Sequence, residues 1–137
     1  MTTTARVGAR DRATTPTTGL HRAFQAASLL AVLSVLFQFI TAGQLFSPGG
    51  GPEAAHSAGA IVLHVVSGLA AVAAFLLWRR KDISTGTLVL AVLVFGFTFV
   101  QAAMVGRSSL YVHVPGAMML TAGVTWLLVA ALRSRRA

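Results

Sequence analysis

Four stretches of this chain are each long and apolar enough to cross the hydrocarbon core of a membrane, which takes about 20 residues. Backbone polar groups in lipid must find partners within their own segment, so each stretch is predicted to be a helix. Apolar residues make up 55% of the 137 residues and charged residues only 10%, values that do not suit a soluble domain. The predicted spans are 24–46, 57–78, 85–105 and 110–132.

The links between these spans are short, and short links make consecutive helices antiparallel neighbours. The sequence therefore predicts an all-α fold, a polytopic membrane four-helix bundle of up-down-up-down order that forms one domain at residues 21–133. Residues 1–20 are rich in Thr and Arg and are expected to form a disordered cytoplasmic tail. Residues 134–137 are expected to form a short basic cytoplasmic tail.

The eleven basic residues are distributed unevenly around the predicted spans. Ten of them lie before the first span, between the second and third, or after the fourth, and only Arg107 lies between the third and fourth. The positive-inside rule then places both termini in the cytoplasm. A single Lys among the eleven favours a bacterial source, so we expect a multi-pass protein of the bacterial cytoplasmic membrane. The basic residues are expected to contact anionic lipid, and no nucleic-acid partner is predicted.

The second half of the chain repeats features of the first half. Similar segments open the second and fourth spans, and the first and third spans also share short sequences. This pattern predicts two tandem two-helix repeats, related by an axis along the membrane normal. Such an axis places His56 and His113, the first residues of the similar segments, at equal depth near the outer surface. The matched features are His56-Ser-Ala-Gly59-Ala60 with His113-Val-Pro-Gly116-Ala117, Leu-Ala-Val-Leu at 30–33 and at 90–93, and Gln38 with Gln101.

Two histidines that face each other across a small bundle are suited to bind haem iron from both sides. The sequence predicts that His56 and His113 are the axial ligands of one haem b, held non-covalently because the chain has no cysteine. Gly59 and Gly116 lie one turn deeper on the same helical faces and are expected to give clearance to the flat macrocycle. Arg107 lies on the same outer side and is expected to pair with a haem propionate.

A third histidine, His64, lies within the second span, about 12 Å below His56 at 1.5 Å per residue. Its repeat counterpart is Thr121, so His64 departs from the internal similarity. We expect a hydrogen bond between His64 and Gln38, which lies at similar depth, with contact to a quinone or a second ligand as the alternative. The aromatic residues expected to cover the haem ring are Phe97, Phe99 and Tyr111.

The chain resembles an uncharacterised family of small four-helix bacterial membrane proteins, catalogued as a domain of unknown function. The resemblance covers residues 20–132 and implies no established activity. The motifs that carry it are Gln38 before Ala42-Gly43, then His56-x-x-Gly59, Gln101, and Tyr111-x-His113-x-Pro115.

The architecture is also similar to one four-helix half of haem A synthase. That enzyme carries histidines near the outer ends of its second and fourth helices, facing one haem, so the likeness implies haem binding by His56 and His113. This chain departs from the enzyme because it has one predicted bundle, no pair of glutamates in an outer loop and no cysteine. These departures argue against haem A synthesis itself.

Three functions compete at this point. The first is a small b-type haem protein that transfers electrons or handles haem at the outer face of the membrane. The second is a cofactor-free structural or assembly subunit of a membrane complex, with its histidines as polar contacts. The third, a small transporter, is disfavoured because no Asp or Glu lies within a predicted span. Compatible partners are the lipid bilayer, a second copy of the chain, a larger membrane complex, a quinone or a redox protein.

Overall fold

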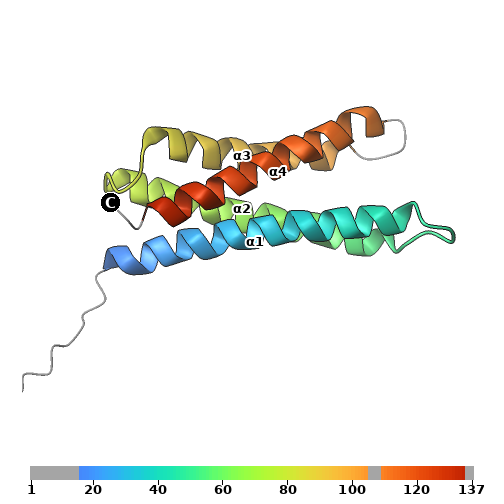
Figure 1. The fold of residues 1–137 in the computed structure, drawn as a ribbon, viewed down its shortest axis with the longest axis horizontal. Coiled ribbons are helices and arrows are strands. Elements are labelled where there is room, and N and C mark those ends of the chain that lie inside the picture. The colour runs from blue at the N-terminus through green and yellow to red at the C-terminus, as the bar shows by residue number, and fades with distance from the viewer. Residues whose placement is uncertain (1–15, 105–108, 135–137) are drawn as a thin grey trace, which may run out of the picture.

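The computed structural model describes residues 16–104 and 109–134, with side chains described from residue 19 onward. Figure 1 shows an antiparallel bundle of long helices without strands in this part of the chain. The prediction of an all-α four-helix bundle is confirmed, and each helix is long and apolar enough to cross a membrane. The helices are α1 (Pro16–Leu45), α2 (Glu53–Arg79), α3 (Thr85–Ala103) and α4 (Leu110–Arg133).

Helix α1 begins earlier than predicted. Residues 16–20 were assigned to the disordered tail, but they form the first turns of this helix. A proline is favoured as the first helical residue, because its ring presets φ and its missing N–H would have had no partner there. The remaining tail predictions, for residues 1–15 and 135–137, lie outside the described residues. At the start of α3, Ser84 acts as a helix cap, because its hydroxyl accepts a hydrogen bond from the Thr87 N–H at 3.2 Å.

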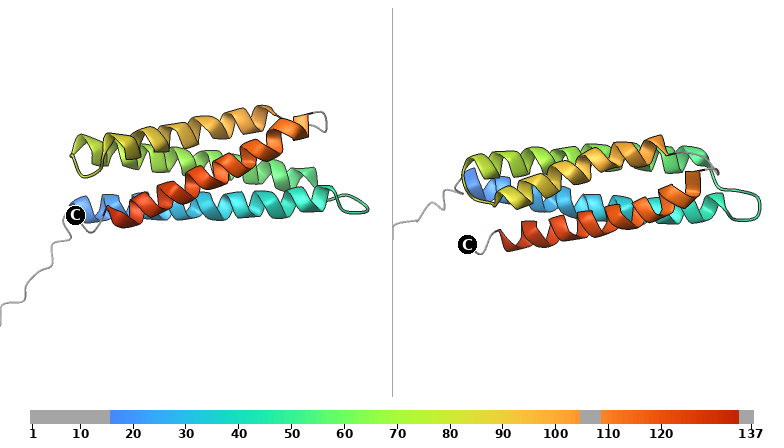
Figure 2. Two further views of the ribbon diagram at one scale, coloured as in Figure 1. Left: turned by 45° about the horizontal axis from the view of Figure 1, so that its top comes forward. Right: turned by 90° about the horizontal axis from the view of Figure 1, so that it is seen from above.

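The helices form a ring in chain order. Helix α1 packs on α2 and α4, and α3 packs on the same two helices. We call α1 with α2 the first hairpin, and α3 with α4 the second hairpin. The start of α1, the α2–α3 connection and the end of α4 lie together, and the α1–α2 connection lies at the opposite end (Figure 1). Helix α4 crosses the bundle obliquely, as Figure 2 shows.

The two ends of the bundle differ in charge. All basic residues of the described part lie at the end that holds the start of α1, and we call this the basic end. The opposite end holds the first turns of α2 and α4, and we call it the histidine end. The basic residues are Arg22, Arg79, Arg80, Lys81 and Arg133.

Large apolar side chains cover the outside of the bundle between the two ends. Leu36, Val65 and Leu93 are each at least half exposed, and so are many other apolar residues along the four helices. A water-soluble protein does not expose apolar surface on this scale, whereas lipid tails solvate it well. The outer surface is therefore suited to a bilayer, and the protein is a multi-pass membrane protein by the length and composition of its helices.

The buried positions of the two hairpins correspond to each other, as expected for two repeats. Buried residues of α2 match buried residues of α4, and the same holds for α1 and α3. The shared Leu-Ala-Val-Leu segments lie three residues out of this register. Each contains one fully buried alanine, Ala31 or Ala91, whereas Leu30, Leu33 and Leu93 are about half exposed or more. The matched buried pairs are Ser28 with Ala91, Ala31 with Val94, Val35 with Thr98, Gly59 with Gly116, Leu63 with Leu120, Ala70 with Leu127, and Ala74 with Ala131.

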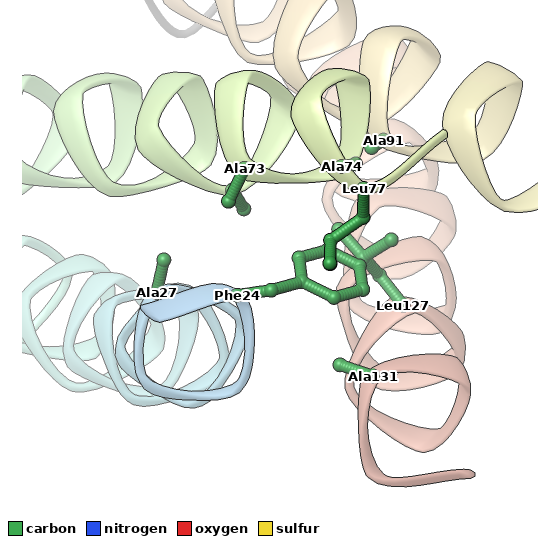
Figure 3. Close-up of a cluster of buried hydrophobic side chains, with 9 residues drawn as sticks. Phe24, Ala27, Ala73, Ala74, Leu77, Ala91, Leu127 and Ala131 are labelled. Atoms are coloured by element: carbon green, nitrogen blue, oxygen red, sulfur yellow. The ribbon is translucent and has the colours of Figure 1, made fainter. Parts of the chain in front are cut away.

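A cluster of buried side chains joins all four helices at the basic end. The Phe24 ring is fully buried and points from α1 toward Leu77 and Leu127 (Figure 3). Small alanines surround it, so the helices approach closely around one large side chain. Beside this cluster, the Gln25 amide donates a hydrogen bond to the Ala131 carbonyl oxygen at 3.0 Å, which ties α1 to α4.

Candidate cofactor site between the two hairpins

A cavity of about 530 Å³ lies between the two hairpins at the histidine end. Ligand pockets typically range from about 300 to 1,000 Å³ and are mostly apolar, so this cavity has the size and character of a binding site. All four helices contribute to its wall. Three histidines, His56, His64 and His113, line it, and the repeat-related pair His56 and His113 come from α2 and α4. Exposed apolar residues such as Ile61 and Val114 also line it, so the cavity reaches the surface of the bundle.

The imidazole of His56 is held by the hydroxyl of Thr41, whose oxygen lies 2.9 Å from His56 Nδ1. Thr41 is buried, and its hydroxyl also lies 3.0 Å from the Phe37 carbonyl oxygen and 3.1 Å from that of Gln38. A hydroxyl has one proton to donate. When a backbone carbonyl accepts that proton, Thr41 accepts a hydrogen bond from Nδ1–H of His56, and this tautomer leaves the Nε2 lone pair of His56 free to bind a metal.

The imidazole of His113 has a different environment. Its Nδ1 atom is buried and makes no hydrogen bond to any residue of the described part. The position that matches Thr41 is occupied by Met104, the residue directly after α3, which has no hydroxyl. Both imidazoles line the cavity, but their surroundings are not equivalent.

Each hairpin contains the same hydrogen bond between a glutamine side chain and a histidine backbone. Gln38 Nε2 donates to the His56 carbonyl oxygen at 3.0 Å, and Gln101 Nε2 donates to the His113 carbonyl oxygen at 3.2 Å. The sequence predicts His64 as the partner of Gln38 and names no partner for Gln101. The structure therefore links the repeated glutamines to the repeated histidines, one pair in each hairpin.

The two glycines of the repeated motif lie beneath these glutamine side chains. A Cβ atom added at Gly59 would lie 2.5 Å from Gln38 Nε2, and one added at Gly116 would lie 2.5 Å from Gln101 Nε2. Both glycines are buried, and neither lines the cavity. The following residues, Ala60 and Ala117, do line it. In the structure, the nearest neighbours of the two glycines are glutamine side chains. The expectation that these glycines leave room for a haem therefore remains a prediction.

His64 lies deeper in the same cavity, with its ring stacked on that of Phe99 at a centroid distance of 4.5 Å. Its Nδ1 atom is buried and has no hydrogen-bond partner in the described part of the chain. The amide nitrogen of Gln38, its expected partner, donates to the His56 carbonyl oxygen instead. The counterpart Thr121 satisfies its own hydroxyl by donating to the Ala117 carbonyl oxygen at 2.7 Å.

The aromatic residues of the cavity wall differ from those expected. Phe97, Phe99 and Tyr111 do not line it, whereas Phe39 of α1 and Phe46, directly after the end of α1, do. The two phenylalanines are seven residues apart in the predicted span 24–46, a spacing that places two residues on one face of a helix, so the sequence could have identified them. The expected propionate partner, Arg107, lies outside the described residues.

The ligand set limits the kind of metal centre that fits. Among the described residues, no group of three or more His, Cys, Asp or Glu side chains lies close enough to hold a metal ion. Zinc sites need three or four protein ligands. Haem needs only one or two axial ligands from the protein, because the porphyrin supplies the other four nitrogens. Two imidazoles in an apolar cavity therefore suit haem better than a bare metal ion.

The family resemblances described above rest on short motifs and on architecture. Comparison with protein-family models, with curated proteins and with solved structures finds no match for this protein.

Proposed function

We propose that this chain is a small integral membrane b-type haem protein, with His56 and His113 as the axial ligands of a non-covalent haem near the outer face. In this role it transfers electrons or handles haem at the membrane surface. The observation that carries the proposal is the cavity between the hairpins, which both repeat-related histidines line. When bound, haem supplies a centre that reversibly accepts and releases one electron.

The residues of the cavity support haem binding in three ways. The Nδ1 contact with Thr41 orients the His56 ring and leaves Nε2 free, as the outer hydrogen bond of a metal-binding histidine usually does. Ala60 and Ala117, one turn beyond the histidines, keep the wall beside them flat. The remaining wall is largely apolar, which excludes water and suits a macrocycle. Arg107 retains its proposed role as a propionate partner.

The same proposal includes an orientation, with the basic end in the cytoplasm of a bacterium and the histidine end outside. It is supported by the five basic residues gathered at the basic end and by the absence of any among the described residues of the histidine end. Short connections follow the positive-inside rule.

Cysteine labelling tests this orientation, because the chain has no native cysteine. A membrane-impermeant maleimide added to intact cells is expected to label Gly50→Cys, in the α1–α2 connection, and to leave Lys81→Cys unlabelled. Lys81→Cys should react only after the membrane is permeabilised. Labelling of Lys81→Cys but not Gly50→Cys in intact cells would reverse the orientation.

The optical spectrum of the purified protein tests the haem proposal directly. Protein expressed with ample haem and purified in mild detergent is expected to show a Soret band and the split visible bands of a low-spin, six-coordinate b-type centre when reduced. Denaturing extraction should release intact haem, because no cysteine is present to attach it. Purification without a Soret band would refute the proposal and favour the cofactor-free structural subunit.

A further inference from the structure

The hydrogen bond from a glutamine to the histidine backbone occurs once in each hairpin, with the same atoms and nearly the same length. We propose that Gln38 and Gln101 are positioning residues, which fix the two haem-binding histidines by holding their backbone. This inference rests on the proposed function. Gly59 and Gly116, each three residues after a histidine, leave the space that the glutamine side chain occupies. Their effect on haem binding is therefore indirect.

The glutamine bond constrains where each imidazole can point. The carbonyl oxygen of a helical residue already accepts one N–H from the next turn, but it has two lone pairs and can accept a second donor. When Gln101 supplies that donor, the backbone of His113 in α4 is held against α3. The direction of the His113 Cα–Cβ bond then follows from the position of the neighbouring helix.

This constraint matters most for His113. The ring of His56 is held a second time by Thr41, but Nδ1 of His113 makes no hydrogen bond to any described residue. The glutamine bond is thus the interaction that the two histidines share. It places both imidazoles toward the cavity even though their ring nitrogens have different surroundings.

The space above each glycine is already filled. The three heavy atoms closest to a Cβ added at Gly116 all belong to the Gln101 side chain, at 2.5, 3.0 and 3.1 Å. At Gly59 the neighbours are Gln38 and, in addition, the ring of Phe37. The second hairpin is therefore the better place for a test, because only Gln101 is among the nearest atoms to a Cβ at Gly116.

A double-mutant cycle in the second hairpin separates this role from direct clearance for haem. Gly116→Ala alone is expected to weaken haem binding about tenfold, or about 1.4 kcal/mol, because the new methyl group displaces the Gln101 amide. Gln101→Ala alone should have a similar effect. In the double variant, binding should stay within about twofold of Gln101→Ala, since contacting residues are strongly non-additive. An additive loss would mean that Gly116 serves the ligand directly and would overturn the inference.

Gly96→Ala provides the matched control, because a Cβ at this exposed α3 glycine has no atom within 4 Å. It should leave haem binding unchanged and should not lower stability, because alanine favours a helix more than glycine does. Gln101→Met keeps the length of the side chain without its N–H donor, and it should change the ferric EPR signal, which depends on the angle between the two imidazole planes. An unchanged EPR signal would show that Gln101 does not position the ligand.

Thermal unfolding of the haem-free protein in detergent gives a measurement independent of haem. Gly116→Ala should lower Tm in the native background and have little effect in the Gln101→Ala background. If the native protein binds no haem but the Tm cycle is non-additive, the proposed function fails while the contact between Gly116 and Gln101 is real. If the native protein binds haem and both cycles are additive, the positioning role fails and the haem proposal stands.

Discussion

Replacing either His56 or His113 with alanine is expected to abolish the low-spin haem spectrum and to lower haem retention more than about 100-fold, since even outer-shell changes cost about 10–100-fold in metal affinity. Each histidine would supply one of the two axial nitrogens, so neither can compensate for the other. The measurement is the reduced-minus-oxidised optical spectrum, together with haem content after detergent purification. Retention of an unchanged spectrum in either variant would exclude that histidine as a ligand.

His64→Thr is the matched control for these variants. His64 lines the same cavity, and threonine is the residue at the corresponding position of the second hairpin. A threonine hydroxyl in a helix can donate to the carbonyl one turn before it, as Thr121 does, so the substitution leaves no unsatisfied donor. The haem spectrum should persist in this variant. If the haem spectrum is lost in His64→Thr but normal in His113→Ala, the second axial ligand is His64 and not His113.

Phe24→Ala should lower the free energy of unfolding by about 3 kcal/mol, the lower end of the range for truncating a buried phenylalanine. Phe24 is fully buried in a cluster drawn from four helices, and the other large buried side chains of that cluster are Leu77 and Leu127 (Figure 3). The low end is expected because lipid solvates an unpacked apolar helix better than water does. Unfolding in mixed detergent micelles measures the change.

Leu36→Ala is the control for the Phe24 variant. Leu36 lies on the same helix but is 51% exposed, so its side chain faces the surroundings of the bundle. Its truncation should change the free energy of unfolding by no more than about 0.5 kcal/mol. Equal losses in the two variants would show that the Phe24 cluster does not stabilise the bundle specifically.

The helices could be predicted from the sequence because hydropathy is a local property. Each membrane-spanning segment must bury its own backbone, so the four apolar stretches mark the four helices within a few residues. The repeated histidines could also be placed at one end of the bundle, since short links fix the direction of each helix. The early start of α1 at Pro16 was missed because the residues there are polar and lie outside the apolar stretch.

The contacts of the site could not be predicted in the same way, because they depend on how each helix is rotated about its axis. Gln38 was expected beside His64 from depth alone, but the rotation of α1 directs its amide to the His56 backbone. The contact between Thr41 and His56 spans two helices for the same reason. The small size of Gly59 and Gly116 was recognised, but sequence spacing alone does not show which group fills the space above them.

The glutamine bonds lie within the hairpins, whereas the cavity lies between them. At the basic end, the Phe24 cluster and the bond from Gln25 to Ala131 join the two hairpins firmly. A second buried cluster, which includes Val35, Leu63 and Leu120, joins the hairpins at the inner wall of the cavity. Only the segments beyond this cluster would therefore separate to widen the cavity, and each histidine would move together with the glutamine of its own hairpin.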